Sequence, residues 1–243
     1  MGDIIKLSSP ATKESDIRSP YWEIPVLFED GDLLIIDKPS NLLAVQNYSL
    51  VEALNIQSLF ARDIERKATW VSNREGLTAL NCLYPLDADT TGVLIFTKTQ
   101  KAQECLKNLL GSEKEFRTYH ALVHGTPLKN EFTIQAGLIP HPRRSDLMKV
   151  DVKRGKKSVT RFKILESYSG YSLLECYPVT ERYLQIRAHL RYIKCPAVCD
   201  SFYHGRPLYL SSLKPKYHPS SRREERPLMG RAALHCSRVE IPH

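Results

Sequence analysis

The apolar positions along the chain follow two periods, and each period predicts its own kind of element. Short apolar runs bounded by turn residues are typical of strands. They occur at 24–28, 33–36, 93–96, 119–125, 159–165, 171–178 and 234–241. Asp30-Gly31 and Ser169-Gly170 each separate two neighbouring runs. A short glycine-containing gap of this kind predicts a β-hairpin, so we expect at least two antiparallel pairs.

Two segments have the spacing of an amphipathic helix. The first runs from about 50 to 64 and follows Ser49 and Glu52, which form a capping box for its first turn. The second covers 102–110 and ends at Gly111, a residue type that commonly terminates helices.

The segment 184–194 predicts a third helix, with a basic stripe. Ile186, Leu190 and Ile193 fall on one helical face, and Arg187, Arg191 and Lys194 share the adjacent face. By contrast, 66–80 has no clear period, and 213–226 is polar, contains proline and predicts an exposed loop.

Strands outnumber helices, and short turns join several of them. This order is typical of an α+β fold with a largely antiparallel sheet. Residues 1–21 mix Ser, Pro, Asp and Lys without a period, which predicts a flexible N-terminal arm. We expect residues 22–243 to form one domain, because no repeat or low-complexity tract divides them.

Composition supports a globular protein. The chain has 243 residues, of which 42% are hydrophobic, so it can bury a sizeable core. No apolar run approaches the length of about 18 residues that a membrane span needs. The six cysteines show no zinc-type spacing even at Cys195 and Cys199, so we expect reduced thiols, no metal site and a cytoplasmic location.

The net charge of +8 is concentrated in two stretches. Each stretch has seven basic residues against two acidic ones, a net charge of +5, so the rest of the chain sums to −2. Such clustering favours a nucleic-acid partner. An acidic membrane surface is disfavoured, because neither stretch is an amphipathic helix with an apolar face. The basic residues of 139–157 are Arg143, Arg144, Lys149, Lys153, Arg154, Lys156 and Lys157, and those of 206–231 are Arg206, Lys214, Lys216, Arg222, Arg223, Arg226 and Arg231.

A group of acids, hydroxyls and one glycine precedes the apolar run at 93–96. Asp87 and Asp89 lie two residues apart, so in an extended segment their side chains point to opposite sides. One acid can then face a cleft while the other supports the turn. Asp, Thr and Gly are also ordinary turn residues, so 87–92 taken alone fits a capped loop as well as a catalytic one.

Six segments together resemble the RluA-type family of RNA pseudouridine synthases, and the similarity covers the chain from about residue 24 to the C-terminus. Each motif is weak alone, but all six follow the order of the family. The second resembles the family's catalytic loop, which reads His-Arg-Leu-Asp, two variable residues, then Thr-Ser-Gly. The segments are 33–39 (LLIIDKP), 86–93 (LDADTTGV), 117–125 (RTYHALVHG), 180–190 (TERYLQIRAHL), 200–205 (DSFYHG) and 231–236 (RAALHC).

The resemblance implies a pseudouridine synthase fold, in which a largely antiparallel mixed sheet is flanked by helices and has a central RNA-binding cleft. It implies that Asp87 is the catalytic carboxylate, Tyr119 the aromatic ring against the uracil, and Arg187 the cation paired with Asp87. An arginine beside a carboxylate favours its ionised form and orients it. Both a nucleophilic and a basic role for Asp87 fit the reaction, which needs no cofactor. The plainer alternatives are a turn acid, a strand aromatic and a surface helix charge.

The implied partner is ribosomal or transfer RNA, bound by a monomer that has no membrane partner. We expect no separate N-terminal RNA-binding module before residue 22, so target choice would depend on the catalytic domain. The competing hypothesis is a catalytically impaired RNA-binding or ribosome-assembly protein that retains the fold. The candidate RNA-binding residues are Arg143, Arg144, Lys153, Arg154, Lys156, Lys157, Arg191, Arg222 and Arg223.

Two departures from the family pattern bear on activity. Tyr84-Pro85 stands where the family has His-Arg, and Glu181 and Leu184 replace a Gly and a His. The family's arginine resembles a wedge that enters the RNA when the uridine is flipped out, and Pro85 cannot do this. Either another residue opens the RNA, or the substrate uridine is already unpaired, or catalysis has been lost while binding remains.

Overall fold

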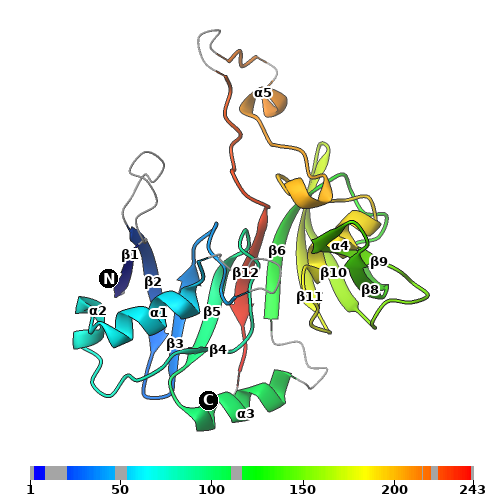
Figure 1. The fold of residues 1–243 in the computed structure, drawn as a ribbon. Coiled ribbons are helices and arrows are strands. Elements are labelled where there is room, and N and C mark those ends of the chain that lie inside the picture. Colours follow the sequence, from blue (N-terminus) through cyan, green and yellow to red (C-terminus); the bar gives the residue numbers. More distant parts are fainter. Residues whose placement is uncertain are drawn as a thin grey trace. The chain divides into compact units, whose positions relative to one another are not determined.

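The computed structural model describes residues 3–8, 21–46, 54–110, 117–214, 216–219 and 224–241, which belong to two compact units (Figure 1). Unit 1 comprises 1–116 and 236–243, and unit 2 comprises 117–235. Both units contain largely antiparallel sheets with a few short helices, so the predicted α+β class is confirmed. The expectation of one domain over 22–243 stays a prediction.

Unit 1 is built on a sheet in the order β1-β2-β3-β5, with β4 also paired to β5. The last strand, β12 (Leu234–Val239), begins in unit 2 and continues in unit 1, where it is the neighbour of β5 in the sheet. The helices α1 and α3 contact β1 and β5 respectively. The strands are β1 (Ile4–Ser8), β2 (Tyr21–Glu29), β3 (Leu33–Lys38), β4 (Asn81–Cys82) and β5 (Thr91–Thr97), and the helices are α1 (Ile56–Glu65), α2 (Thr69–Ser72) and α3 (Gln100–Leu110).

The predicted hairpin between β2 and β3 is confirmed. Its turn is closed by Asp30, whose Oδ1 accepts hydrogen bonds of 2.8 Å from the backbone N–H groups of Asp32 and Leu33. In the core of unit 1, the centroid of the Phe60 ring lies 5.3 Å from that of Trp70 and 5.0 Å from that of Phe96. These aromatic contacts fasten α1 and α2 to the central strand β5.

Three predictions for unit 1 need correction. Residues 4–8 are not part of a flexible arm, because Ile5 and Leu7 are fully buried and β1 pairs with β2. Helix α1 begins at Ile56 rather than near 50, because the side chain of Asn55 accepts from the Ser58 N–H and caps it. The predicted capping box of Ser49 and Glu52 lies outside the described residues. Helix α2 occupies part of the segment expected to be irregular.

Unit 2 contains a sheet in the order β6-β11-β10-β7 and a separate two-stranded sheet of β8 and β9. The hairpin predicted around Ser169-Gly170 joins β10 and β11. Helix α4 contacts β9, β10 and β11, and α5 stands away from the sheet on a projecting segment (Figure 1). The strands are β6 (Arg117–His124), β7 (Glu131–Gln135), β8 (Leu138–His141), β9 (Arg144–Val150), β10 (Val159–Tyr168) and β11 (Tyr171–Pro178), and the helices are α4 (Gln185–Tyr192), the 3-10 turn η1 (Ser201–Tyr203) and α5 (Leu210–Leu213).

The strands β7, β8 and β9 were missed. Proline and a cluster of charges interrupt the apolar pattern of β8 and β9, and only one residue of β7, Ile134, is buried. An edge strand with one buried side chain has too weak a period to be seen in sequence. Much of the first basic stretch therefore lies in a β-ribbon.

Candidate active site

Asp87 lies in the loop of unit 1 that connects β4 to β5. The Thr90 N–H donates to the Asp87 carbonyl at 3.1 Å, which closes a turn with Ala88 and Asp89 at its centre. Both aspartates are half-buried. Directly after the turn, Gly92 has a φ of 109°, and a side chain there would begin 2.1 Å from the Cys236 carbonyl oxygen. Only glycine allows this approach, so the position of the loop against β12 depends on Gly92.

Tyr84 braces the same loop from inside. Its side chain is 1% exposed, and its hydroxyl donates to the Val93 carbonyl at 3.0 Å. The Cys82 thiol donates to the Tyr84 carbonyl at 3.1 Å, and burial raises the pKa of that thiol to about 12, so it stays protonated. Pro85, in contrast, is exposed. The two residues that depart from the family's His-Arg therefore differ in role, because Tyr84 holds the loop and Pro85 faces solvent.

Lys38 is a further support of this loop that the sequence reasoning missed. Its side chain is fully buried, and its ammonium donates to the carbonyls of Pro39, Leu42 and Ala88 at 2.8, 2.6 and 3.0 Å. A buried ammonium needs such acceptors, because an unpaired one would be very costly. The contact with Ala88 fixes the backbone beside Asp87. The signal in the sequence is a lysine at the end of the strand LLIIDK, within the first of the six motifs.

Tyr119 lies on β6 in unit 2 and is 6% exposed. Arg117, Tyr119 and Ala121 alternate along the strand, so all three project from its buried face. Arg117 forms an ion pair with Glu181. Glu181, which replaces the family's glycine, is therefore paired with a buried arginine that lies two residues before Tyr119.

Arg187 is buried in unit 2, with 1% of its side chain exposed. Its Nε and Nη2 donate to the two carboxylate oxygens of Asp200, each at 2.7 Å. The Asp200 carboxylate also accepts from the backbone N–H groups of Phe202 and Tyr203. The basic stripe predicted for this helix is therefore divided, because Arg187 is buried whereas Arg191 and Lys194 are exposed. Asp200 was not predicted, although it opens the fifth motif.

The side chains that hold α4 form a closed polar network. The Gln185 amide N–H donates to the Thr160 hydroxyl, and that hydroxyl lies 2.9 Å from His189 Nδ1. His189 Nε2 lies 2.9 Å from the Ala136 carbonyl, which can only accept, so Nε2 carries the proton and Nδ1 accepts from Thr160. Burial lowers the pKa of His189, against the smaller opposing effect of the Ala136 carbonyl. The imidazole is thus neutral and structural.

Leu184 accounts for the remaining departure from the family. It occupies the position that precedes α4 with a φ of 53°, and it is 3% exposed. Its side chain joins a buried apolar cluster with Leu138, Leu147, Ala188 and Tyr203. A leucine at this site packs α4 against the β8–β9 ribbon, where a histidine would be a buried polar group in need of a partner.

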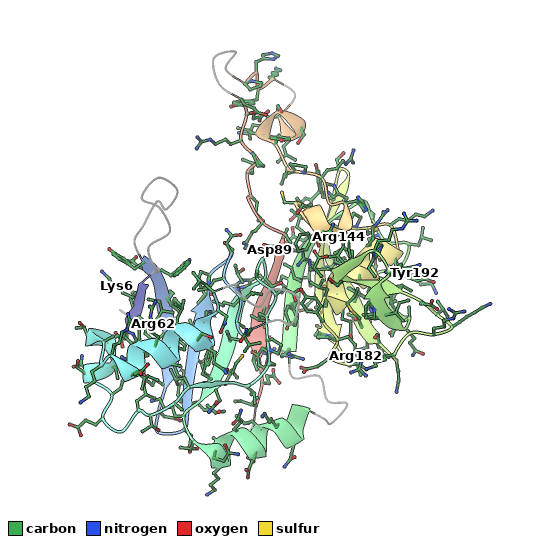
Figure 2. The ribbon with its side chains drawn as sticks, in the orientation of Figure 1. Lys6, Arg62, Asp89, Arg144, Arg182 and Tyr192 are labelled. Carbon is green, nitrogen blue, oxygen red and sulfur yellow. The ribbon has the colours of Figure 1, made fainter. Side chains whose placement is uncertain are left out.

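The candidate RNA-binding residues of the first basic stretch are exposed on unit 2. Lys153, Arg154, Lys156 and Lys157 lie in a loop that follows β9. Asp151 Oδ1 accepts from the backbone N–H groups of Arg154 and Lys153, which lowers the pKa of that carboxyl and shapes the loop. Arg143, Arg144 and Arg191 are exposed as well, and Figure 2 labels Arg144. Arg222 and Arg223 lie outside the described residues.

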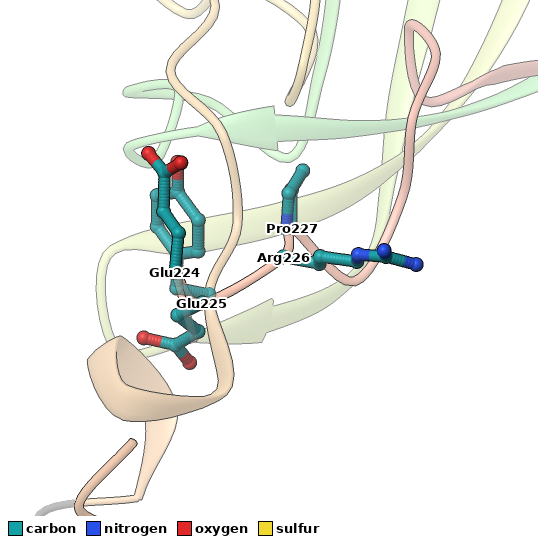
Figure 3. A pocket seen from close by; sticks show the side chains of 5 residues that line it. Glu224, Glu225, Arg226 and Pro227 are labelled. Carbon is teal, nitrogen blue, oxygen red and sulfur yellow. The ribbon is translucent and has the colours of Figure 1, made fainter. Parts of the chain in front are cut away.

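A pocket at the base of α5 holds none of the predicted catalytic residues. It is lined by Tyr209, Glu224, Glu225, Arg226 and Pro227 (Figure 3). Glu225 accepts from both the backbone N–H and the hydroxyl of Ser211, so its carboxylate is committed to holding the projecting segment together. Figure 3 shows Arg226 directed away from the two glutamates.

The structure describes Asp87 within unit 1, and Tyr119 and Arg187 within unit 2. The predicted pairing of Arg187 with Asp87 stays a prediction. Among the described residues, no three His, Cys, Asp or Glu side chains gather as a metal site. In the same part of the chain, every helix is too short or too polar to cross a bilayer.

The family model described as RNA pseudouridylate synthase matches residues 32–192. The chain belongs to this family. The match contains Asp87, Tyr119 and Arg187, together with the loop and strand that carry the first two. The pseudouridine synthase fold that the resemblance implied is confirmed by a solved structure entitled Human RNA Pseudouridylate Synthase Domain Containing 4. It superposes with a TM-score of 0.64 at 19% identity, covering 87% of this chain and 81% of the human chain.

Two bacterial relatives extend the family match over most of the chain. An uncharacterized RNA pseudouridine synthase of Bacillus subtilis is 29% identical over 84% of this chain. Ribosomal large subunit pseudouridine synthase D of Xanthomonas campestris is 32% identical over 95% of this chain. The chain spans 66% of the length of each of these relatives, slightly less than two thirds.

Proposed function

We propose that this chain is an RNA pseudouridine synthase that isomerises uridine to pseudouridine in ribosomal or transfer RNA. The observation that carries the proposal is the family match over 32–192, which includes all three candidate catalytic residues. The name of the Xanthomonas relative favours ribosomal RNA of the large subunit as the first substrate to test.

The reaction needs a carboxylate and a way to hold the detached base. The bond between N1 of uracil and C1′ of the ribose breaks, a bond from C5 to C1′ forms, and the C5 proton is lost while N1 gains one. Atoms and electrons balance without an oxidant or a reductant. We assign the carboxylate to Asp87, acting as nucleophile or base, and the stacking surface for the uracil to Tyr119.

Arg187 is assigned to the orientation of Asp87 and to its ionised form. Its bidentate pair with Asp200 supports this role, because a guanidinium held at two nitrogens keeps a fixed plane. The Asp200 carboxylate accepts from Nε and Nη2 of Arg187 and so fixes the orientation of the guanidinium. A rigid donor needs little reorganisation during the reaction.

The proposed enzyme acts as a monomer in the cytoplasm, with RNA as its partner and without a cofactor. The two basic stretches both lie in unit 2, which is consistent with an RNA-binding role for that unit. Arg222 and Arg223 remain candidates from the sequence alone.

Mass-spectrometric mapping of pseudouridine tests the proposal. Ribosomal and transfer RNA would be compared between cells with the gene, cells without it, and cells that carry the Asp87→Asn variant. We expect at least one site to lose pseudouridine without the gene and to stay unmodified with the variant. Identical maps in all three would contradict the proposed activity.

A specific observation favours a second candidate, a catalytically impaired RNA-binding protein. Tyr84-Pro85 replaces the family's His-Arg, and Tyr84 is fully engaged in bracing the loop. This candidate predicts that the purified chain binds RNA but forms no pseudouridine on any uridine, paired or unpaired. It also predicts that removal of the gene alters ribosome assembly with no change in the pseudouridine map.

A further inference from the structure

Phe202 is an apolar ring at the surface of unit 2 between two arginines. It is 36% exposed, in the 3-10 turn η1. The Arg187 guanidinium carbon lies 5.2 Å from its ring centroid, and that of Arg144 lies 5.3 Å from it. A single exposed phenylalanine is ordinary on a protein surface. An exposed ring between two guanidinium groups is a more specific arrangement, because its neighbours are cations.

The position of this ring is fixed by its neighbours in sequence. Asp200 caps η1 and holds Arg187 with the same carboxylate. The Tyr203 hydroxyl donates to the Met148 carbonyl at 2.9 Å and accepts from the Met148 N–H at 3.2 Å. This pair of bonds fastens η1 to β9, the strand that begins at Arg144. Contacts among Asp200, η1 and β9 thus hold the Phe202 ring, Arg187 and Arg144 together.

Arg144 is placed to meet an anion. Its side chain is 47% exposed, and Asp146 accepts from its Nε and Nη2, so Nη1 can donate to another acceptor. A ligand that offers a flat π surface to Phe202 and an anionic oxygen to Arg144 is a nucleotide. Because Arg144 is half exposed, its guanidinium can also move onto the outer face of a base that stacks on the ring.

We propose that Phe202 and Arg144 form a subsite for the nucleotide next to the target uridine. The base of that nucleotide stacks on Phe202, and its phosphate contacts Arg144. The contact between Phe202 and Arg187 places the subsite beside a residue assigned to catalysis, so this inference rests on the proposed function for the identity of the neighbouring uridine. The subsite would make the enzyme sensitive to the presence of a base at one flanking position.

The test compares the affinities of wild type and Phe202→Leu for single-stranded RNAs of nine nucleotides with a central uridine. Each flanking position in turn carries adenine, the fluorescent base 2-aminopurine, or an abasic residue. Stacking on an aromatic side chain predicts that Phe202→Leu weakens binding of the adenine RNA by about five- to a hundredfold. With the abasic residue at the contacted position, wild type and Phe202→Leu should bind equally. Stacking should also quench 2-aminopurine fluorescence at that position in wild type only.

Matched variants separate the roles of the ring and the charge. Arg144→Gln should reduce the slope of log affinity against log salt by about 0.7, whereas Phe202→Leu should leave the slope unchanged. Phe202→Tyr keeps the ring and should bind as wild type does. Tyr168→Leu removes another exposed aromatic, 51% exposed at the end of β10, and should also have no effect.

Three results would overturn the subsite. These are equal binding by wild type and Phe202→Leu on every RNA, an equal loss on the abasic RNAs, or a loss in Phe202→Tyr as large as in Phe202→Leu. Pseudouridine formation is measured on the same RNAs. If Phe202→Leu weakens binding as expected but no pseudouridine forms, the subsite is retained and the proposed activity is rejected. If pseudouridine forms but Phe202→Leu does not affect binding, the activity is retained and the subsite is rejected.

Discussion

At the scale of a single residue, Arg187 is a buried cation that is held by a carboxylate of its own unit. Its charge is balanced inside unit 2 by Asp200, so the pair can remain buried without a ligand. Removing one member of a buried pair costs about 3–5 kcal/mol, because the other charge is then unpaired. Asp200 is therefore as important to the proposed site as the arginine it holds.

His189 gives a prediction of pH dependence. The folded state lowers the pKa of this imidazole below its ordinary value of about 6.5, so the unfolded chain binds the proton more readily. Its contribution to stability should be complete above about pH 6.5 and lost as the pH falls, by at most about 1.4 kcal/mol per pH unit. Denaturant unfolding from pH 5 to 8 measures this against His189→Gln, which cannot titrate. Parallel stability profiles of the two proteins would contradict the neutral network.

Position 85 gives a prediction of substrate structure. Extrusion of a base from a helix costs a few kcal/mol, and Pro85 offers no side chain that could replace it in the stack. A uridine in a loop should therefore react faster than the same uridine closed into a stem. Because Pro85 is exposed, Pro85→Arg can be made without burying a charge, and it should narrow the difference. Equal single-turnover rates of wild type on both RNAs would show that another residue opens the stem.

At the scale of elements, periodicity predicted α4 and the two hairpins but not what positions the site. The apolar residues of 184–194 indicate a helix because they recur at helical spacing. The network that orients α4 joins His189 to Thr160 and Ala136, residues far away in sequence with no local pattern. Lys38 is a similar case, since its contact with Ala88 spans fifty positions. Long-range polar contacts of this kind follow from the tertiary fold and not from a local period.

The basic loop after β9 gives a prediction at the same scale. If its four cations contact single-stranded RNA phosphates, their replacement by glutamine should reduce the slope of log affinity against log salt by roughly three units. The measurement is RNA affinity across a salt series. Four exposed cations of unit 1 replaced in the same way serve as the control and should leave the slope nearly unchanged. The test residues are Lys153, Arg154, Lys156 and Lys157, and the control residues are Arg66, Lys67, Lys101 and Lys107.

If the slope of log affinity against log salt falls equally for both sets of variants, the positive charge acts only through long-range attraction of the RNA. The loop would then have no specific contact with RNA, and the affinity would follow net charge alone.

At the scale of the whole molecule, the basic stretches and the candidate catalytic carboxylate belong to different units. Both basic stretches belong to unit 2, and the loop with Asp87 belongs to unit 1. The sequence was sufficient to predict the family and the α+β class, because six motifs in order carry more information than any element boundary. It was not sufficient to predict the ribbon of β8 and β9, whose strands contain proline and charges.

The central claim is that Asp87 performs the isomerisation, and the matched pair Asp87→Asn and Asp89→Asn tests it most directly. Both substitutions remove one charge from half-buried carboxylates of the same turn. The measurement is pseudouridine formation by each purified variant on an RNA that the wild type modifies, with RNA affinity and thermal unfolding measured alongside. We expect Asp87→Asn to lose at least about a hundredfold in rate with its fold and affinity retained, and Asp89→Asn to lose far less. A near wild-type rate for Asp87→Asn, or a greater loss for Asp89→Asn, would contradict the assignment.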